Sequence, residues 1–235
     1  SVNESIWGLL IVLFIAMVIV SQFMLTFGSD PNAKITKKSK SPLSFHPIAL
    51  IFGLLSFVSY LVEGAVGDWS ALYLFEDKGI VIEEAVMGVM LFNGTMCIGR
   101  LLGNRLGKHL TSKQVVVGGY LLGSIAMGLI VFLPGHASMY TYLLLGISLA
   151  MIVPNLFSAM GEQNVIPMTQ AVATSTMLGY MGILMGPALI GFIAHGTSLT
   201  VAFIVLTTLL VVSAGIGKYA YHLMSKDCGL SEEQI

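Results

Sequence analysis

Long apolar runs, separated by short polar segments, make up most of this sequence. Each of the seven longest runs is near or above the roughly 20 residues that a helix needs to cross a lipid bilayer. Their length excludes a transmembrane barrel, because membrane strands alternate apolar and polar residues over only about 10 residues. Backbone groups in lipid must be satisfied within their own segment, so the runs predict helices. The predicted spans are about 5–27, 48–75, 85–103, 115–133, 139–160, 170–194 and 200–222.

The composition agrees with an all-α integral membrane protein. Of the 235 residues, 56% are hydrophobic and only 10% are charged, whereas a soluble domain carries about 25% charged residues. The mean hydropathy is +0.89. A net charge of −1 gives no indication of a nucleic-acid partner. Cys97 and Cys228 have no metal-binding spacing and no nucleophile–base pair is evident, so neither a cofactor nor an enzyme is expected.

Basic residues predict the orientation of the spans, because cytoplasmic loops are enriched in Lys and Arg. The lysines of the linker 30–47, the basic residues around the turn 100–113 and the lysines after the last span would be cytoplasmic, which leaves Lys78 outside. The C-terminus would then be cytoplasmic and residue 1 periplasmic. The chain starts SVNES, without Met or a signal-peptide pattern, so we expect that segments precede it; a processed N-terminus is the alternative.

The pattern also predicts how the chain is divided. The six helices after the linker form two triplets, 48–133 and 139–222, which start on opposite sides of the membrane as inverted repeats do. The predicted parts are a first helix at 1–28, a basic cytoplasmic loop at 29–47, a six-helix bundle at 48–225 and a cytoplasmic tail at 226–235.

Glycines and prolines inside the spans bear on how the helices pack. Many glycines recur at a spacing of four, which lets helix backbones approach closely. Pro154 and Pro187 each remove one backbone hydrogen bond from a predicted span. Each proline is either a tolerated kink or a point at which a moving helix bends. The spaced glycines are Gly99, Gly103 and Gly107, Gly119 and Gly123, and Gly182 and Gly186.

Three motifs resemble signatures of the major facilitator superfamily (MFS). GRLLGNRLGKHL at 99–110 resembles its loop signature G-x-x-x-D-R-x-G-R-R. GYMGILMGPALIG at 179–191 resembles the Gly-Pro signature of its fifth and eleventh helices, and the basic linker matches the loop between its two halves. EGAVGDWSALYL at 63–74 is similar to the MosC-like branch of the superfamily. The loop match comprises Gly103, Arg105, Gly107 and Lys108, with Asn104 in place of the usual Asp.

The resemblance implies a parent protein of twelve helices, of which helices six to twelve are present and the N-terminal six-helix half of the same polypeptide is absent. It implies a secondary transporter in the bacterial inner membrane, with a small solute, protons and lipid as partners. It also implies a cytoplasmic gate, in which Asn104 replaces a charge-assisted contact by a weaker neutral one. The gating candidates are Arg100, Gly103, Asn104, Arg105, Gly107, Lys108, Pro154, Gly186 and Pro187.

Glu63 is the main candidate for proton or solute binding. It lies near mid-depth of the predicted span 48–75, where an ionised carboxylate costs at least ~2.5–3.5 kcal/mol on insertion scales. The cost falls if the group is protonated or faces a water-filled cavity. Glu63 is therefore either a proton acceptor or solute ligand, or a carboxyl group that a neighbouring helix satisfies.

Four more polar residues are candidates for the same site. Asp68 lies about 140° round the helix from Glu63, either at the mouth of a pathway or as a tie at the outer helix end. Tyr60, one turn before Glu63, can share its face and donate a hydrogen bond, or can merely fill space. Asn93 and Asn155 lie within spans and either line a central cavity or bond to neighbouring helices.

A proton-coupled secondary transporter is therefore the first functional hypothesis. A uniporter, or an efflux antiporter whose coupling residues lie in the absent half, is the alternative. A seven-helix receptor or photoreceptor is remote, because a retinal protein needs a lysine in the middle of its last span and Lys218 lies near the cytoplasmic end. A channel finds no support, since the sequence has no filter-like loop.

Overall fold

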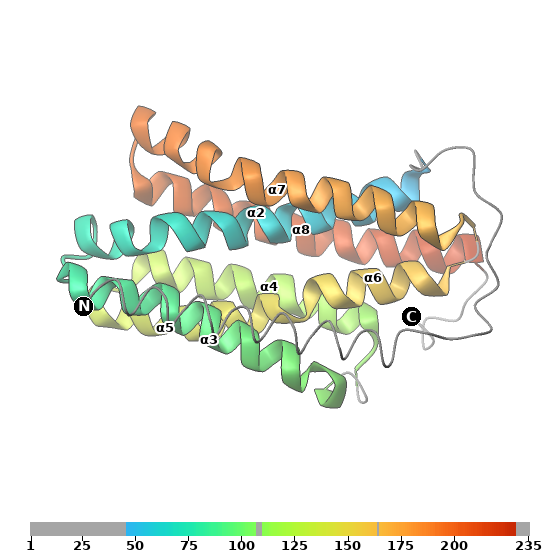
Figure 1. The fold of residues 1–235 in the computed structure, drawn as a ribbon, viewed down its shortest axis with the longest axis horizontal. Coiled ribbons are helices and arrows are strands. Elements are labelled where there is room, and N and C mark those ends of the chain that lie inside the picture. Colours follow the sequence, from blue (N-terminus) through green and yellow to red (C-terminus); the bar gives the residue numbers. More distant parts are fainter. Residues whose placement is uncertain (1–45, 107–109, 164, 229–235) are drawn as a thin grey trace, which may run out of the picture. The chain divides into compact units, whose positions relative to one another are not determined.

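The chain folds into a bundle of α-helices (Figure 1). The computed structural model describes residues 46–106, 110–163 and 165–228. The predicted first helix, most of the basic linker and the end of the tail lie outside the described residues. The described helices are α2 (Pro47–Glu76), α3 (Ile82–Leu106), α4 (Ser112–Phe132), α5 (Gly135–Ala150), α6 (Ile152–Glu162), α7 (Met168–Gly196) and α8 (Leu199–Cys228).

Six spans in the described part are long and apolar enough to cross a membrane, with α5 and α6 together forming one of them. Each corresponds to a predicted run, so the expectation of an all-α membrane protein is confirmed for six of the seven predicted spans. The first predicted span falls on residues that the structure does not describe. The six spans are Pro47–Glu76, Ile82–Gly103, Ser112–Phe132, Gly135–Glu162, Met168–Gly196 and Leu199–Lys226.

Local capping explains where some of these helices begin. At the start of α2, the His46 side chain accepts a hydrogen bond from the Ile48 amide, and Pro47 occupies the first turn, where its missing N–H costs nothing. At the start of α4, Thr111 and Gln114 form a reciprocal capping box. The sequence thus sets these boundaries before any packing between helices.

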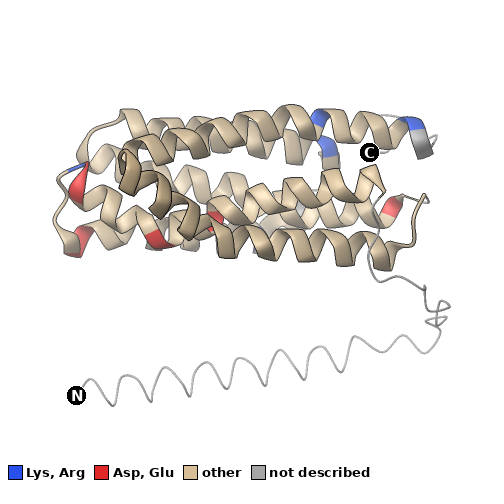
Figure 2. Ribbon diagram, turned by 90° about the horizontal axis from the view of Figure 1, so that it is seen from above, with Lys and Arg blue, Asp and Glu red and all other residues tan. Residues whose placement is uncertain are grey.

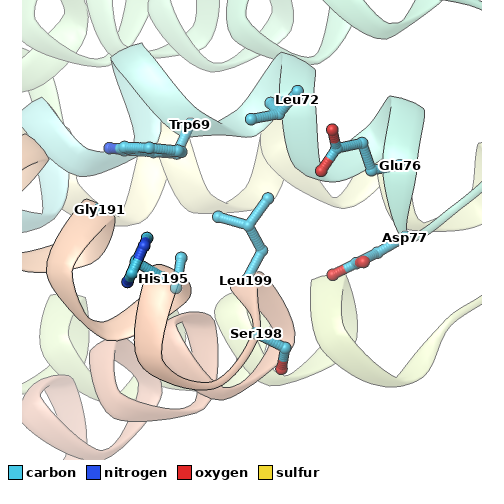
Figure 3. Close-up of a pocket in the computed structure, with 9 residues that line it drawn as sticks. Trp69, Leu72, Glu76, Asp77, Gly191, His195, Ser198 and Leu199 are labelled. Atoms are coloured by element: carbon cyan, nitrogen blue, oxygen red, sulfur yellow. The ribbon is translucent and has the colours of Figure 1, made fainter.

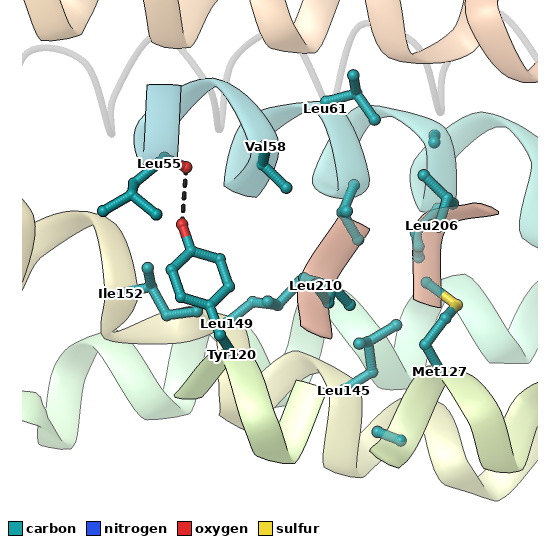
Figure 4. Packing of buried hydrophobic residues seen from close by; sticks show 14 of the residues in the cluster. Leu55, Val58, Leu61, Tyr120, Met127, Leu145, Leu149, Ile152, Leu206 and Leu210 are labelled. Carbon is teal, nitrogen blue, oxygen red and sulfur yellow. Dashed lines mark hydrogen bonds between the residues drawn. The ribbon is translucent and has the colours of Figure 1, made fainter. Parts of the chain in front are cut away.

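Helix α2 lies at the centre of the bundle and makes its most extensive contact with α7. The other large contacts join α3 to α5, and α4 to both α5 and α8. Figure 4 shows the apolar core between α2, α4, α5 and α8, with a buried hydrogen bond between α4 and α2. The Tyr120 hydroxyl donates to the Leu55 carbonyl at 2.7 Å. Since that proton is used, Ser59 must donate in its own contact with Tyr120 at 2.8 Å.

Glycines allow α2 and α7 to approach until backbone meets backbone. A side chain at Gly182 would collide with the carbonyl of Phe57, and one at Gly186 with the carbonyl of Leu61. Near the α2–α3 turn, the Trp69 indole N–H donates to the Pro187 carbonyl at 3.0 Å. The predicted close packing at Gly182 and Gly186 is thus confirmed, and it joins these two helices in particular.

The two span prolines have different effects on their helices. Before Pro154 the span breaks: α5 ends at Ala150, α6 begins at Ile152, and Met151 between them has φ −102° and ψ −6°. Pro187 leaves α7 continuous from Met168 to Gly196. Only the first proline therefore marks an interruption.

Charged residues gather at the ends of the bundle. Figure 2 shows acidic residues at the end that holds the turn 77–81, which we call the outer end because the charge pattern predicts it to be extracytoplasmic. Lys78, the exception to the charge pattern, donates from Nζ to the carbonyls of Val131 at 2.6 Å and Leu133 at 2.9 Å. These carbonyls end α4, where the helix dipole favours a cation. Partial burial lowers the pKa of Lys78, and the Asp77 carboxylate opposes this shift.

Candidate functional site

Glu63 and Arg100 form an ion pair between α2 and α3. Arg100 Nη2 lies 3.2 Å from Oε2 and 3.4 Å from Oε1 of Glu63. Arg100 was predicted at the cytoplasmic turn, whereas the structure places it within helix α3, six residues before the helix ends at Leu106. The residue lies within the span Ile82–Gly103 and reaches across to α2. The Glu63 carboxylate is therefore paired with a basic residue of a neighbouring helix.

The pair is not sealed within the bundle. The Glu63 side chain is 22% exposed and the Arg100 side chain 44% exposed. Only one guanidinium nitrogen of Arg100, Nη2, contacts Glu63. Within the described part of the chain, no acceptor contacts the other guanidinium N–H groups. A charged pair that is partly open, on spans that cross the membrane, is the arrangement expected at an ion or solute pathway.

An aromatic pair lies beside the ion pair. Tyr60, one turn before Glu63 on α2, stacks on Tyr180 of α7 with ring centroids 6.0 Å apart and an interplanar angle of 7°. No hydrogen bond joins Tyr60 to Glu63 in the described part of the chain. The two residues share a region of α2 as predicted, but the Tyr60 ring is used in stacking.

The other predicted polar residues do not converge on Glu63. Asp68 is exposed and has no polar partner among the described side chains. Asn93 is exposed on α3 and donates to the Val89 carbonyl of its own helix at 3.1 Å. Asn155 donates to the Met151 carbonyl at 2.8 Å, at the break between α5 and α6. Among the described residues, neither asparagine forms a hydrogen bond to a neighbouring helix, and both alternatives remain predictions.

The gating candidates are only partly described. The side chains of Asn104 and Arg105, and the whole of Gly107 and Lys108, lie outside the described residues. Gly103 packs against the Met151 side chain, so this glycine of α3 meets the break between α5 and α6. The gate itself remains a prediction.

A cavity of about 490 Å³ opens at the outer end between α2, α7 and the start of α8. Figure 3 shows the indole of Trp69 and the imidazole of His195 on its walls, with the carboxylates of Glu76 and Asp77 on the side of the turn. Asp77 accepts a hydrogen bond from Thr200 at 2.9 Å. This cavity is distinct from the Glu63–Arg100 pair, which does not line it.

Two bacterial membrane proteins are similar in sequence to this chain. An uncharacterised MFS-type transporter of Yersinia pestis is 41% identical over 168 residues, which cover 70% of this chain and 43% of the relative. The membrane protein MosC of Rhizobium meliloti is 30% identical over 170 residues, covering 71% of this chain and 42% of MosC. The chain is related to MFS-type transporters. It spans less than half of the length of either relative.

A solved structure has a similar fold. The crystal structure of the Escherichia coli fucose:proton symporter FucP is similar with a TM-score of 0.65, at 16% sequence identity over 74% of this chain and 42% of FucP. At this identity the likeness concerns the fold alone, and it matches half of an MFS fold. No protein-family model matches the chain.

Sequence reasoning missed the partner of Glu63, although a signal was present. Arg100 is the basic residue inside the predicted span 85–103. Ionisable groups within membrane spans are usually paired, so the position of Arg100 inside a predicted span indicates an acidic partner. The stack of Tyr60 on Tyr180 had no such signal, because aromatic residues occur throughout the spans.

Proposed function

We propose that this chain is the C-terminal six-helix part of a proton-coupled secondary transporter, with a further helix ahead of it. The Glu63–Arg100 pair carries this proposal, because a carboxylate and its counter-ion, both partly exposed, lie on two neighbouring candidate spans. The relatives support the transporter class. A second six-helix half, supplied by the same polypeptide in the bacterial inner membrane, completes the central cavity, and rocking of the two halves exposes the solute to each side in turn.

Proton coupling follows from the charges of the pair. When Glu63 is ionised, it neutralises Arg100 and holds α3 against α2. When Glu63 takes up a proton, Arg100 keeps its charge but loses its counter-ion, so an acceptor group of a polar solute stabilises it. Solute binding and proton binding at mid-membrane then favour each other. Asn93 and the Tyr60 ring line the approach in this proposal, and Gly103, Arg105 and their neighbours form the inner gate. Asp68 lies about 140° round α2 from Glu63 and is not part of the approach.

The test uses the full-length protein. A thermal-stability screen with sugars, polyols, amino acids and organic ions first identifies a stabilising solute, since a bound ligand raises the stability of the native form. Uptake of that solute into proteoliposomes is then measured with and without a pH gradient. We expect Glu63→Gln to abolish accumulation driven by the gradient and to preserve exchange of solute at equal pH.

Two outcomes decide between the candidate mechanisms. Asp68→Asn is the matched control, because it removes a carboxylate from the same helix without breaking an ion pair, and it should keep proton-driven accumulation. If Glu63→Gln accumulates solute as the unaltered protein does, Glu63 is not the coupling residue. A protein that only equilibrates the solute, whatever the pH gradient, would instead be a uniporter.

A further inference from the structure

Three buried hydroxyl groups without hydrogen bonds lie together in the outer part of the bundle. Ser70 and Tyr73 of α2 and Tyr142 of α5 are each 0% exposed, and none of their hydroxyl oxygens forms a hydrogen bond of good geometry with another described residue. Ser70 and Tyr73 both lie within interaction range of the Tyr142 hydroxyl. Leaving a buried hydroxyl unpaired is costly, and a trapped water molecule with two to four polar neighbours is the usual remedy.

The cluster lies on the same face of α2 as Glu63. Ser70 follows Glu63 by two helical turns, and Asp77 follows Ser70 by two more, so the three residues form one stripe along the helix. The stripe ends at the exposed Asp77 carboxylate, which accepts from Thr200 at 2.9 Å. Thr200 also interacts with the hydroxyl of Tyr73. Polar groups therefore connect the outer end of the bundle with the buried cluster.

A gap of roughly 10 Å along the helix axis separates Ser70 from Glu63. Gly67 lies between them, and a side chain placed there would meet no atom within 4 Å among the described residues. The neighbouring Val66 is 0% exposed. Gly67 is itself exposed, so the surface of α2 is open to water at this position, one turn from both polar residues.

We infer that Ser70, Tyr73, Tyr142 and the open surface of α2 at Gly67 form a water-binding route through which protons pass between the outer end of the bundle and Glu63. This inference rests on the proposed function, since it requires that Glu63 is protonated during the cycle. Each hydroxyl or water oxygen accepts a proton on a lone pair and releases its own proton to the next oxygen. The route therefore ends each transfer with its groups unchanged, once they have reoriented.

Water fits the cluster better than a metal cation does. The three hydroxyls are neutral, and a cation enclosed by them would remain without a compensating charge. Tyr73 is also held in place by Phe203, whose ring stacks on it at 4.3 Å between centroids. The cluster is therefore a fixed set of donors and acceptors and has no negative charge of its own.

Dicyclohexylcarbodiimide gives a direct test, because it reacts with protonated carboxyl groups in apolar surroundings. The full-length protein is placed in right-side-out vesicles with the internal pH held constant, and labelling of Glu63 is measured by mass spectrometry as the external pH is varied. In the unaltered protein we expect labelling to increase as the external pH falls. Gly67→Leu covers the open surface between Ser70 and Glu63 with an apolar side chain, and Tyr142→Phe removes one hydroxyl. Each variant should therefore slow the response of labelling to external pH at least fivefold.

Gly94→Leu is the matched control, since Gly94 on α3 also has no atom within 4 Å of an added side chain. It should respond as the unaltered protein does. If Tyr142→Phe and Gly67→Leu follow external pH at the unaltered rate, the route is wrong while Glu63 protonation stands. If Glu63 is not labelled at any pH, the proposed coupling fails as well. Protection by sodium ions at constant pH would place a cation in the cluster and would also overturn the route.

Discussion

Helix α2 contacts α7 and α3 in two different ways. Against α7, glycines bring backbone to backbone along the length of the helix, and Trp69 adds a hydrogen bond near the outer end. Against α3, the contact includes the partly exposed Glu63–Arg100 pair and Leu74 packed on Gly88. The first contact resists any sliding because backbone atoms would collide. The second can open when one charge is neutralised, so α2 and α7 form a stiff pair beside which α3 can shift.

The largest expected effect comes from breaking the stiff contact. Gly182→Leu would push a side chain into the Phe57 backbone, and we expect the free energy of unfolding to fall by about 3 kcal/mol. Denaturant unfolding of the full-length protein in detergent measures it. Gly94→Leu, which adds the same side chain to open space, should change stability by less than about 0.5 kcal/mol. Equal losses for both variants would show that α2 and α7 are not closely packed.

The second effect concerns the contact with α3. Arg100→Gln leaves the Glu63 carboxylate without its counter-ion, and we expect a loss of about 1–2 kcal/mol, limited because Arg100 is 44% exposed. Adding Glu63→Gln should restore most of that loss. A double-mutant cycle gives the coupling energy, for which we expect about 1 kcal/mol. Additive effects of the two substitutions would mean that the pair does not hold α3.

A third, smaller effect tests the outer end of the stiff contact. Trp69→Phe keeps an aromatic ring against Gly191 but removes the hydrogen bond to the Pro187 carbonyl. We expect a loss of about 1 kcal/mol. Thermal unfolding in detergent measures it, with Trp7 outside the described residues left unchanged as a spectroscopic reference. A variant as stable as the unaltered protein would assign this contact to ring packing alone.

The smallest effect concerns Lys78, which joins the α2–α3 turn to the end of α4. Lys78→Met removes two hydrogen bonds to terminal carbonyls, with an expected loss of about 0.5–1 kcal/mol near neutral pH. Because burial lowers the pKa of Lys78 from its ordinary value of 10.5, the unfolded state binds more protons just below that pH. The unaltered protein should therefore gain stability relative to the variant as pH rises toward 10.5. A relative loss over that window would contradict the burial of Lys78.

The sequence predicted the helices better than their contacts. Apolar runs alone located the six described spans, because hydropathy and length are local properties. The sequence predicts a lost backbone hydrogen bond at both Pro154 and Pro187. Whether the helix is interrupted there depends on the residues packed around it, and only the span of Pro154 is interrupted. The partner of Glu63 lies on another helix, and which faces of two helices meet depends on the packing of the whole bundle. The hydroxyls of Ser70 and Tyr142 come together for the same reason, and no local pattern links them.

The Glu63–Arg100 pair also bears on how the chain enters the membrane during synthesis. Its two residues are 37 positions apart, on consecutive spans, whereas Trp69 and its partner Pro187 are 118 apart. An α2–α3 hairpin can therefore leave the translocon with its opposite charges already joined, long before α7 is made. Since each isolated charge costs about 2.5–3.5 kcal/mol to insert, early pairing lets a helix with a carboxylate at mid-depth partition into lipid.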